Sequence, residues 1–200
     1  SKENAKLYSI LESSKSSIDD FSFLSSKEYI HQSAQVINNS VYKRNNYLTI
    51  NKGKIDGVKE GMGIINLNGI VGIVHSVSDN YALIISVLHQ KSAISVQLKK
   101  QRNTGFLKWG GFNYLQAEIV DIPEHINLEI GDTISSSGYG TIFPKGIDIG
   151  TVRSWGTSKK TGSYSIKIKF FQDFNALEFV YIVYSPKSYE QKKLEKKIDG

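Results

Sequence analysis

The sequence predicts an all-β chain that folds as two small antiparallel β-barrels. The first observation is the stretch from Gly131 to Val152, in which a turn led by glycine opens a short strand and a glycine-spaced strand follows. A fainter version runs from Gly57 to Val74, about seventy residues earlier. Glycine before or inside a strand commonly marks a positive-φ turn or a bend at a barrel corner. Two such cassettes therefore indicate two related barrels.

The second observation is the alternation of apolar and polar residues. Residues 93–98 place Ile94, Val96 and Leu98 on one face, and residues 163–170 repeat the pattern. Helical periodicity is absent between about residues 35 and 185, so no crossover helix is available and the sheets must be antiparallel. Strands are predicted near residues 34–38, 46–51, 62–67, 70–77, 81–88, 92–98, 103–109, 114–121, 132–135, 148–155, 163–171 and 178–185.

The two ends of the chain differ from the middle. Residues 1–12 predict a short helix in which Leu7, Ile10 and Leu11 share one face, and a Ser-rich linker follows. We expect the chain to divide into the helix and linker at 1–33, a first barrel at 34–98 completed by 163–185, a second barrel at 99–162, and a charged tail at 186–200.

Composition sets broad limits on function. The chain has 200 residues, no cysteine and a net charge of +6, which excludes disulfides and thiolate metal sites and is a mild positive bias. No run of about 18 apolar residues is present, so nothing in this sequence predicts a membrane span. The chain begins at Ser1 rather than Met, so we expect it to be a fragment, and the sequence leaves open a targeting segment upstream.

A two-barrel chain in which Gly131-Asp132 shortly precedes Ser137-Gly138 invites comparison with serine peptidases. The nucleophile would be Ser137, the base His75 or His89, and the orienting acid Asp121 or Asp132. The Gly-Asp-Ser-Gly sequence typical of chymotrypsin-like enzymes is missing, which disfavours catalysis.

Metal and phosphate sites find little support. The four histidines are isolated in the sequence, with no spacing typical of metal ligands, and the glycine-rich turns open strands rather than helices. An oligonucleotide-binding barrel is the main alternative, because residues 102–114 interleave aromatic and basic side chains. No cofactor is expected.

Aromatic residues form two candidate protein-binding patches. The first contains Phe106, Trp109, Phe112 and Tyr114, with Trp109 expected near a hairpin tip and partly exposed. The second contains Tyr139 and Phe143 on the glycine-rich loop. Ordinary core packing is the alternative for each ring, and for Phe143 that alternative is a plug in the second barrel.

Several blocks in this order resemble the family of the bacterial rod shape-determining protein MreC. The blocks are Ala34-Gln-Val-Ile, Leu48-Thr-Ile-Asn-Lys-Gly, Gly57-Val-Lys-Glu-Gly-Met, Gly69-Ile-Val-Gly-Ile-Val, Gly131-Asp, Ser136-Ser-Gly138 and Phe143-Pro-Lys-Gly-Ile-Asp-Ile-Gly150. They cover roughly residues 34 to 185. The resemblance implies two barrels arranged somewhat as in chymotrypsin but without catalysis, preceded by a coiled coil that would end at Leu7, Ile10 and Leu11 and mediate dimerisation.

The resemblance also implies a function. It predicts a non-enzymatic scaffold of the machinery that builds the lateral cell wall, in the periplasmic part of a protein anchored by one inner-membrane helix. The implied partners are a class B penicillin-binding transpeptidase that the scaffold activates, MreD, RodA and, across the membrane, MreB. Self-association as dimers or filaments is implied as well, and nucleic acid is not an implied partner.

Overall fold

The computed structural model describes residues 29–123, 126–158 and 163–195, which fold almost entirely as β-structure. The strands are β1 (Ile30–Asn39), β2 (Asn45–Ile50), β3 (Gly63–Asn66), β4 (Gly69–Val77), β5 (Ala82–His89), β6 (Ile94–Leu98), β7 (Thr104–Lys108), β8 (Gln116–Pro123), β9 (Thr133–Ser136), β10 (Asp148–Ser158), β11 (Ser163–Phe170) and β12 (Phe179–Tyr184). Two 3-10 turns, η1 (Lys54–Asp56) and η2 (Phe174–Ala176), and the helix α2 (Pro186–Glu195) complete the described chain. Each of the twelve predicted strands is confirmed, with shifts of a few residues at the ends.

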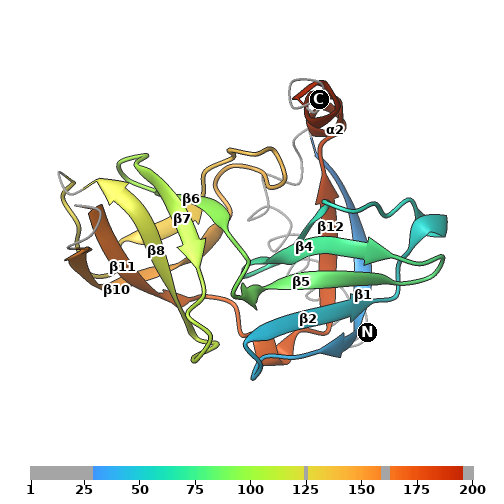
Figure 1. Cartoon of the computed structure of the whole chain (residues 1–200), viewed down its shortest axis with the longest axis horizontal. Helices are drawn as coiled ribbons and strands as arrows, with labels where there is room; N and C mark the ends of the chain where they lie inside the picture. Colours follow the sequence, from blue (N-terminus) through green and yellow to red (C-terminus); the bar gives the residue numbers. More distant parts are fainter. Residues whose placement is uncertain (1–28, 124–125, 159–162, 196–200) are drawn as a thin grey trace, which may run out of the picture.

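The strands close into two antiparallel barrels that lie side by side (Figure 1). The first barrel has the order β1-β12-β3-β4-β5-β2, and the second has the order β10-β11-β8-β7-β6-β9. The second barrel is therefore inserted between β5 and β12 of the first. Closure leaves neither sheet with an open edge, which removes the usual template for edge-to-edge aggregation.

The expected division of the chain between the barrels was wrong for two strands. β6 was assigned to the first barrel, but it pairs with β7 and β9 of the second. β11 was expected to return to the first barrel, but it pairs with β8 and β10, and only β12 returns. Alternation reports which residues face inward, whereas the choice of neighbouring strand depends on pairing across long stretches of chain.

The two glycine cassettes adopt the same local structure, as the repeat predicts. In the first, the carbonyl of Val74 accepts a hydrogen bond from the N–H of Gly61 at 2.9 Å, and the N–H of Val74 donates to the carbonyl of Met62 at 2.9 Å. In the second, Val152 makes the corresponding two bonds with the N–H of Gly131 and the carbonyl of Asp132, both at 2.9 Å. Gly61 and Gly131 have φ values of 83° and 93°, a left-handed conformation that glycine adopts without a steric penalty.

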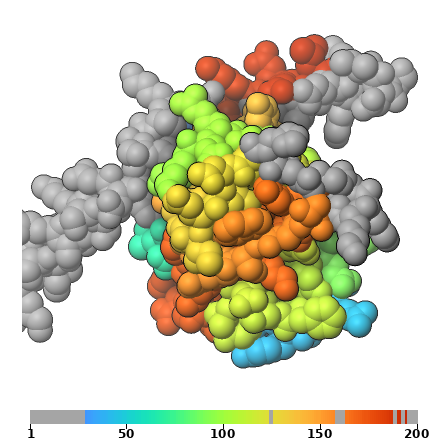
Figure 2. All heavy atoms as spheres, turned by 90° about the vertical axis from the view of Figure 1, so that its left-hand side faces the viewer, coloured from blue at the N-terminus to red at the C-terminus, as the bar shows by residue number. Residues whose placement is uncertain are grey.

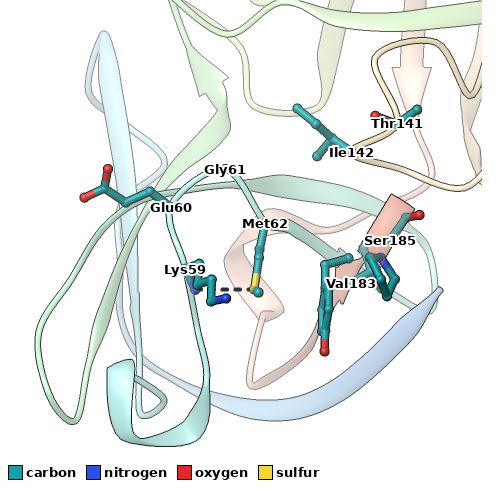
Figure 3. Close-up of a pocket in the computed structure, with 10 residues that line it drawn as sticks. Lys59, Glu60, Gly61, Met62, Thr141, Ile142, Val183 and Ser185 are labelled. Carbon is teal, nitrogen blue, oxygen red and sulfur yellow. Dashed lines mark hydrogen bonds between the residues drawn. The ribbon is translucent and has the colours of Figure 1, made fainter. Parts of the chain in front are cut away.

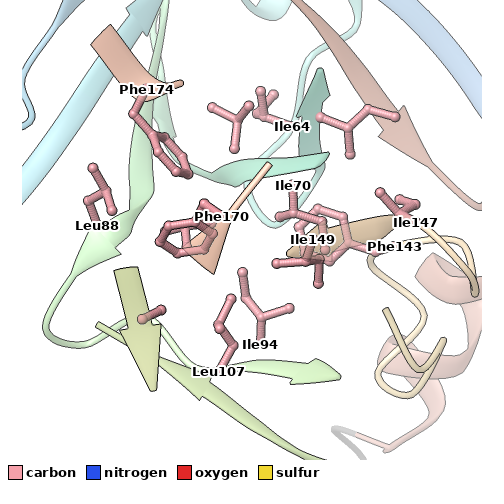
Figure 4. Close-up of a cluster of buried hydrophobic side chains, with 14 of the residues drawn as sticks. Ile64, Ile70, Leu88, Ile94, Leu107, Phe143, Ile147, Ile149, Phe170 and Phe174 are labelled. Carbon is pink, nitrogen blue, oxygen red and sulfur yellow. The ribbon is translucent and has the colours of Figure 1, made fainter. Parts of the chain in front are cut away.

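One continuous hydrophobic core joins the barrels, as Figure 4 shows. Phe170, at the end of β11, packs edge-to-face on Phe174 of η2 with ring centroids 5.0 Å apart. Phe143 of the second barrel lies so close to Gly63 of β3 that a Cβ atom on that glycine would be 2.7 Å from the ring. Each such buried side chain contributes about 1.5–3 kcal/mol, so the shared core favours a single rigid body.

The remaining expectations concern the ends of the chain. The proposed dimerisation residues Leu7, Ile10 and Leu11 lie outside the described residues. In the expected charged tail, residues 186–195 form α2. Across the described ranges of the chain, no helix has both the length and the apolar character needed to cross a membrane. The likeness of the barrel arrangement to that of chymotrypsin stays a prediction.

Candidate functional site

A groove of about 480 Å³ lies where the two barrels meet. One wall comes from β6 and β7 of the second barrel, the other from the β9–β10 loop, and β4 of the first barrel contributes one residue. The residues that line this inter-barrel groove are Ile73, Ala93, Ile94, Ser95, Thr104, Phe106, Ser136, Gly138, Tyr139, Gly140, Ile142 and Phe143. Three of the six predicted partner-binding residues are thus brought together by the fold.

Two aromatic rings of the groove are available to a partner. Phe106 is 44% exposed on β7, and Tyr139 is 73% exposed on the β9–β10 loop. Gly138 and Gly140 flank Tyr139, and both have a φ of 80°. The left-handed backbone on each side holds the intervening tyrosine out from the loop at positions where other residues would be strained.

Serine hydroxyls hold the β9–β10 loop in place. Ser137 Oγ donates to Ser95 Oγ at 2.7 Å and accepts a hydrogen bond from the N–H of Tyr139 at 3.1 Å. The buried Ser136 Oγ donates to the carbonyl of Pro144 at 2.5 Å and accepts from the N–H of Ile147 at 2.8 Å. The loop that presents Tyr139 is therefore fixed by bonds at both ends, which lowers the entropy lost on binding.

Phe143 does not have the exposure expected of a partner-binding residue. It is only 6% exposed, and its ring packs against Gly63 of the first barrel. The plug alternative is closer to the structure, although the ring fills the space between the barrels rather than the second barrel alone. Phe143 forms part of the wall of the groove and sets the distance between the barrels there.

Trp109 lies in the loop of the β7–β8 hairpin, as expected, but the expectation that it is partly exposed was wrong. The side chain is 5% exposed, and its Nε1–H donates to the carbonyl of Asn113 at 2.9 Å. The indole therefore folds back beneath its own loop, because a buried indole N–H needs an acceptor and the loop supplies one. Trp109 has a structural role at this position and offers little surface to a partner.

Phe112 and Tyr114 lie outside the groove, in the β7–β8 loop at the foot of the molecule in Figure 1. Phe112 is 89% exposed. Tyr114 packs edge-to-face on Tyr42 of the β1–β2 loop, with centroids 5.7 Å apart. Figure 2 shows these two loops next to each other at the foot of the molecule. The first predicted patch, and with it the stacking platform of an oligonucleotide-binding barrel, is thus divided between the groove, the core and this foot.

A smaller pocket of about 240 Å³ adjoins the groove (Figure 3). Met62 and Val183 of the first barrel line it, together with Thr141 and Ile142 of the β9–β10 loop. Ile142 lines the groove as well. A change in the position of the β9–β10 loop would therefore alter both hollows together.

The peptidase hypothesis fails on geometry. Ser137 meets Ser95 rather than an imidazole, and His75 is exposed at a bulge of β4. His89 is buried, with Nε2 3.1 Å from the hydroxyl of Tyr47. Burial lowers the pKa of His89, and the nearby charges of Lys91 and His75 lower it further.

The candidate acid Asp132 has a structural partner. Its Oδ1 lies 2.8 Å from Nζ of Lys100, and its Oδ2 accepts from the N–H of Glu129 at 2.9 Å. Burial alone would raise the pKa of Asp132, but the hydrogen bonds from Lys100 and Glu129 outweigh burial and hold the pKa below its usual value. Asp121, the other candidate, lies within β8 and has a φ of 64°. Among the residues that the structure describes, no group of three or more His, Cys, Asp or Glu side chains is placed to hold a metal ion.

Sequence reasoning missed the apolar lining that the first barrel contributes. Ile73 reads as an ordinary strand residue, and it enters the groove only because the two barrels pack together. Ile142 adjoins Phe143, so the glycine-rich loop was the available signal for that residue. No local pattern marks a groove built from strands of two different barrels.

Comparisons with known proteins agree with this architecture. The family model described as rod shape-determining protein MreC, barrel core, matches residues 36–184. The cell shape-determining protein MreC of Listeria monocytogenes is 26% identical over 160 residues, which are 78% of this chain and 54% of that protein. The chain spans about half the length of this curated relative.

Solved structures give the same result. MreC from Listeria monocytogenes superposes with a TM-score of 0.73 at 26% identity, covering 92% of this chain and 91% of that one. A complex of penicillin-binding protein PBP2 with MreC from Helicobacter pylori matches with a TM-score of 0.64 at 18% identity, covering 79% and 99%. With the family model spanning both barrels, the chain belongs to the family of the rod shape-determining protein MreC.

Proposed function

We propose that the chain is a non-enzymatic scaffold of lateral cell-wall synthesis, which binds a class B penicillin-binding transpeptidase through the inter-barrel groove and favours its active form. The observation that carries the proposal is the pair of exposed rings, Phe106 and Tyr139, on opposite walls of one preformed groove. The Helicobacter pylori relative, whose structure was solved with PBP2, supports the choice of partner.

The groove has the properties of a protein-binding site. Aromatic side chains that pack into a partner supply most of the energy of typical interfaces, and rigid walls reduce the entropy lost on association. Phe106 sits on a barrel strand, and Tyr139 sits on a loop fixed by the hydroxyls of Ser136 and Ser137. A partner strand or loop that fills the groove would cover both rings.

Activation needs only a difference in affinity between the two states of the partner. If the groove binds the active transpeptidase about 100-fold more tightly than the inactive form, the equilibrium shifts by about 2.7 kcal/mol. No catalytic group of the scaffold is required for this effect.

The wider assembly belongs to the same proposal. The barrels would lie outside the inner membrane, anchored through a single membrane helix in the complete protein. MreD, RodA and MreB would be further partners, and the segment containing Leu7, Ile10 and Leu11 would hold two copies together.

The proposal is tested by titrating the chain against the periplasmic part of the class B transpeptidase from the same organism, with its acylation rate followed in parallel. Tyr139→Ala and Phe106→Ala should each weaken binding by about tenfold or more, as expected for interface hot spots. Tyr81→Ala is the matched control, because Tyr81 is exposed on the first barrel and does not line the groove. Equal affinity for all three variants would refute the groove as the site, and binding without faster acylation would refute activation.

A further inference from the structure

A polar pocket of about 610 Å³ lies on the first barrel and shares no lining residue with the inter-barrel groove. The β1–β2 hairpin forms most of it, with contributions from β5 and η2. The lining residues that matter here are Asn38, Asn39, Tyr42, Asn45, Thr49 and Asn175. Its volume falls within the range of small-molecule sites.

The walls of this pocket are fixed by hydrogen bonds. The buried Asn46 holds the hairpin loop, because its Nδ2 donates to the carbonyls of Lys43 at 2.6 Å and Leu88 at 2.8 Å, and its Oδ1 accepts from the N–H of Lys43 at 3.0 Å. Asn39 Nδ2 donates to the carbonyl of Phe174 at 2.6 Å and so ties η2 to β1. The pocket therefore exists before any ligand arrives.

Several polar groups in the pocket remain available to a ligand. Within the described part of the chain, the side chains of Asn38, Asn45, Thr49 and Asn175 make no hydrogen bond to protein. Each amide supplies two donors and an acceptor, and the hydroxyl supplies one donor and two acceptors. A ligand with many hydroxyl groups, which both donate and accept, would match this set.

The charge of the lining favours a neutral ligand. Among the described residues, no carboxylate lines the pocket, so a metal cation or an amine would lack a counter-charge. In the lining that the structure describes, Lys43 is the one charged residue, and it is exposed, so a phosphate would find a single well-hydrated cation there.

An aromatic ring completes the site. Tyr42 is 82% exposed, and its ring meets Tyr114 edge-to-face with an interplanar angle of 82°. The contact orients the ring, and the 82% exposure leaves most of the ring surface open. Such a face is a suitable platform for the C–H side of a pyranose ring, while amides at the same site bind the sugar hydroxyls.

We propose that this pocket binds a neutral oligosaccharide, with Tyr42 as the stacking platform and the side chains of Asn38, Asn45 and Asn175 as hydroxyl ligands. Tyr47 of the pocket pairs with Ile85, which pairs with Ile73 of the groove, so these two lining residues lie two strands apart, with a backbone separation of about 10 Å. A glycan bound here would lie beside whatever protein occupies the groove. The site does not depend on that protein, so the two proposals can fail separately.

The test is a titration of the whole chain with chitotetraose and with cellotetraose, followed by NMR of the side-chain amides. Binding with a Kd of about 1 mM or tighter, with shifts of the Asn38, Asn45 and Asn175 amides, supports the proposal. If only chitotetraose binds, the site recognises the acetamido group. If both sugars bind, it recognises the pyranose hydroxyls. Tyr42→Ala should weaken binding about tenfold, Asn45→Ala about fivefold, and the controls Tyr81→Ala and Asn80→Ala should leave it unchanged.

Three results would overturn the proposal. They are the absence of shifts for both sugars up to about 20 mM, equal affinity in wild type and Tyr42→Ala, or tighter binding of inorganic phosphate than of either sugar. The groove variant Tyr139→Ala should bind sugar as wild type does, so loss of transpeptidase binding cannot be mistaken for loss of the sugar site.

Discussion

The contact between Phe143 and Gly63 determines how closely the barrels approach, and substitution at both positions tests it. A methyl group on Gly63 would lie 2.7 Å from Cε1 of Phe143 and 3.1 Å from the carbonyl oxygen of Ile142. Carbon atoms in ordinary contact are about 3.5–4.0 Å apart, so the methyl group would overlap the ring by about 1 Å. We expect Gly63→Ala to reduce the free energy of unfolding by about 1–3 kcal/mol through overpacking.

Removing the ring should reverse this effect. Phe143→Ala empties a buried site and should lower the free energy of unfolding by about 3–5 kcal/mol. In that background the methyl group of Gly63→Ala enters vacated space and recovers about 0.8 kcal/mol by burial. The two substitutions should therefore show a coupling free energy of about 2–4 kcal/mol, in the sense that the double variant is more stable than the sum predicts.

The assay is urea unfolding of the four proteins of the cycle, with the buried Trp109 as the fluorescent reporter. Phe143→Leu replaces Phe143→Ala if the latter does not fold. Additivity within about 0.5 kcal/mol would show that the methyl group and the ring do not compete for the same space. The account of how the barrels are joined would then be wrong.

Three further predictions concern the barrels themselves. Gly150→Ala should lower the free energy of unfolding by about 3 kcal/mol, because the new Cβ would lie 2.2 Å from a backbone oxygen of β11. Gly156→Ala in the same strand should be neutral, because its Cβ would meet no atom within 4 Å. Thermal unfolding distinguishes the two variants. Asn46→Ala should lower the free energy of unfolding, measured by urea denaturation, by about 3 kcal/mol, because the backbone carbonyls that Asn46 binds lose their partner. Because the folded-state pKa of Asp132 is below 3.8, its ionised form stabilises the fold above that pH, and the contribution is lost as pH falls through the folded pKa. Wild type should therefore lose more stability between neutral pH and pH 3 than Lys100→Ala does, and equal losses would contradict the assignment.

The strands could be predicted from sequence because their signals are local. Alternation at Ile94, Val96 and Leu98, and the glycine turns at Gly61 and Gly131, are each read within a few residues, and the structure confirms them. The repeat of the cassette also predicted two barrels, because one local conformation recurs with the same hydrogen bonds.

The placement of strands and of the site could not be predicted in this way. β6 and β11 pair in the second barrel through contacts distant in sequence, and alternation is the same in either barrel. Trp109 has the neighbours of an exposed turn residue, yet its N–H finds an acceptor four residues later and the ring is buried. The groove joins Ile73 to Tyr139 only after the barrels have packed.

The return of β12 to the first barrel has a consequence for how the chain is made. β1 pairs with β12, joining Ile30 to Tyr184, so the first barrel stays open until residues 179–184 have been synthesised. Until then β1 and β3 each present an unpaired edge, which is the feature that recruits other chains. The strands of the second barrel are consecutive in the chain, so this barrel can close earlier. It then holds the gap between β1 and β3, which β12 later fills, at a fixed width. Chains that end before residue 179 should consequently aggregate, whereas chains that lose only α2 should remain soluble.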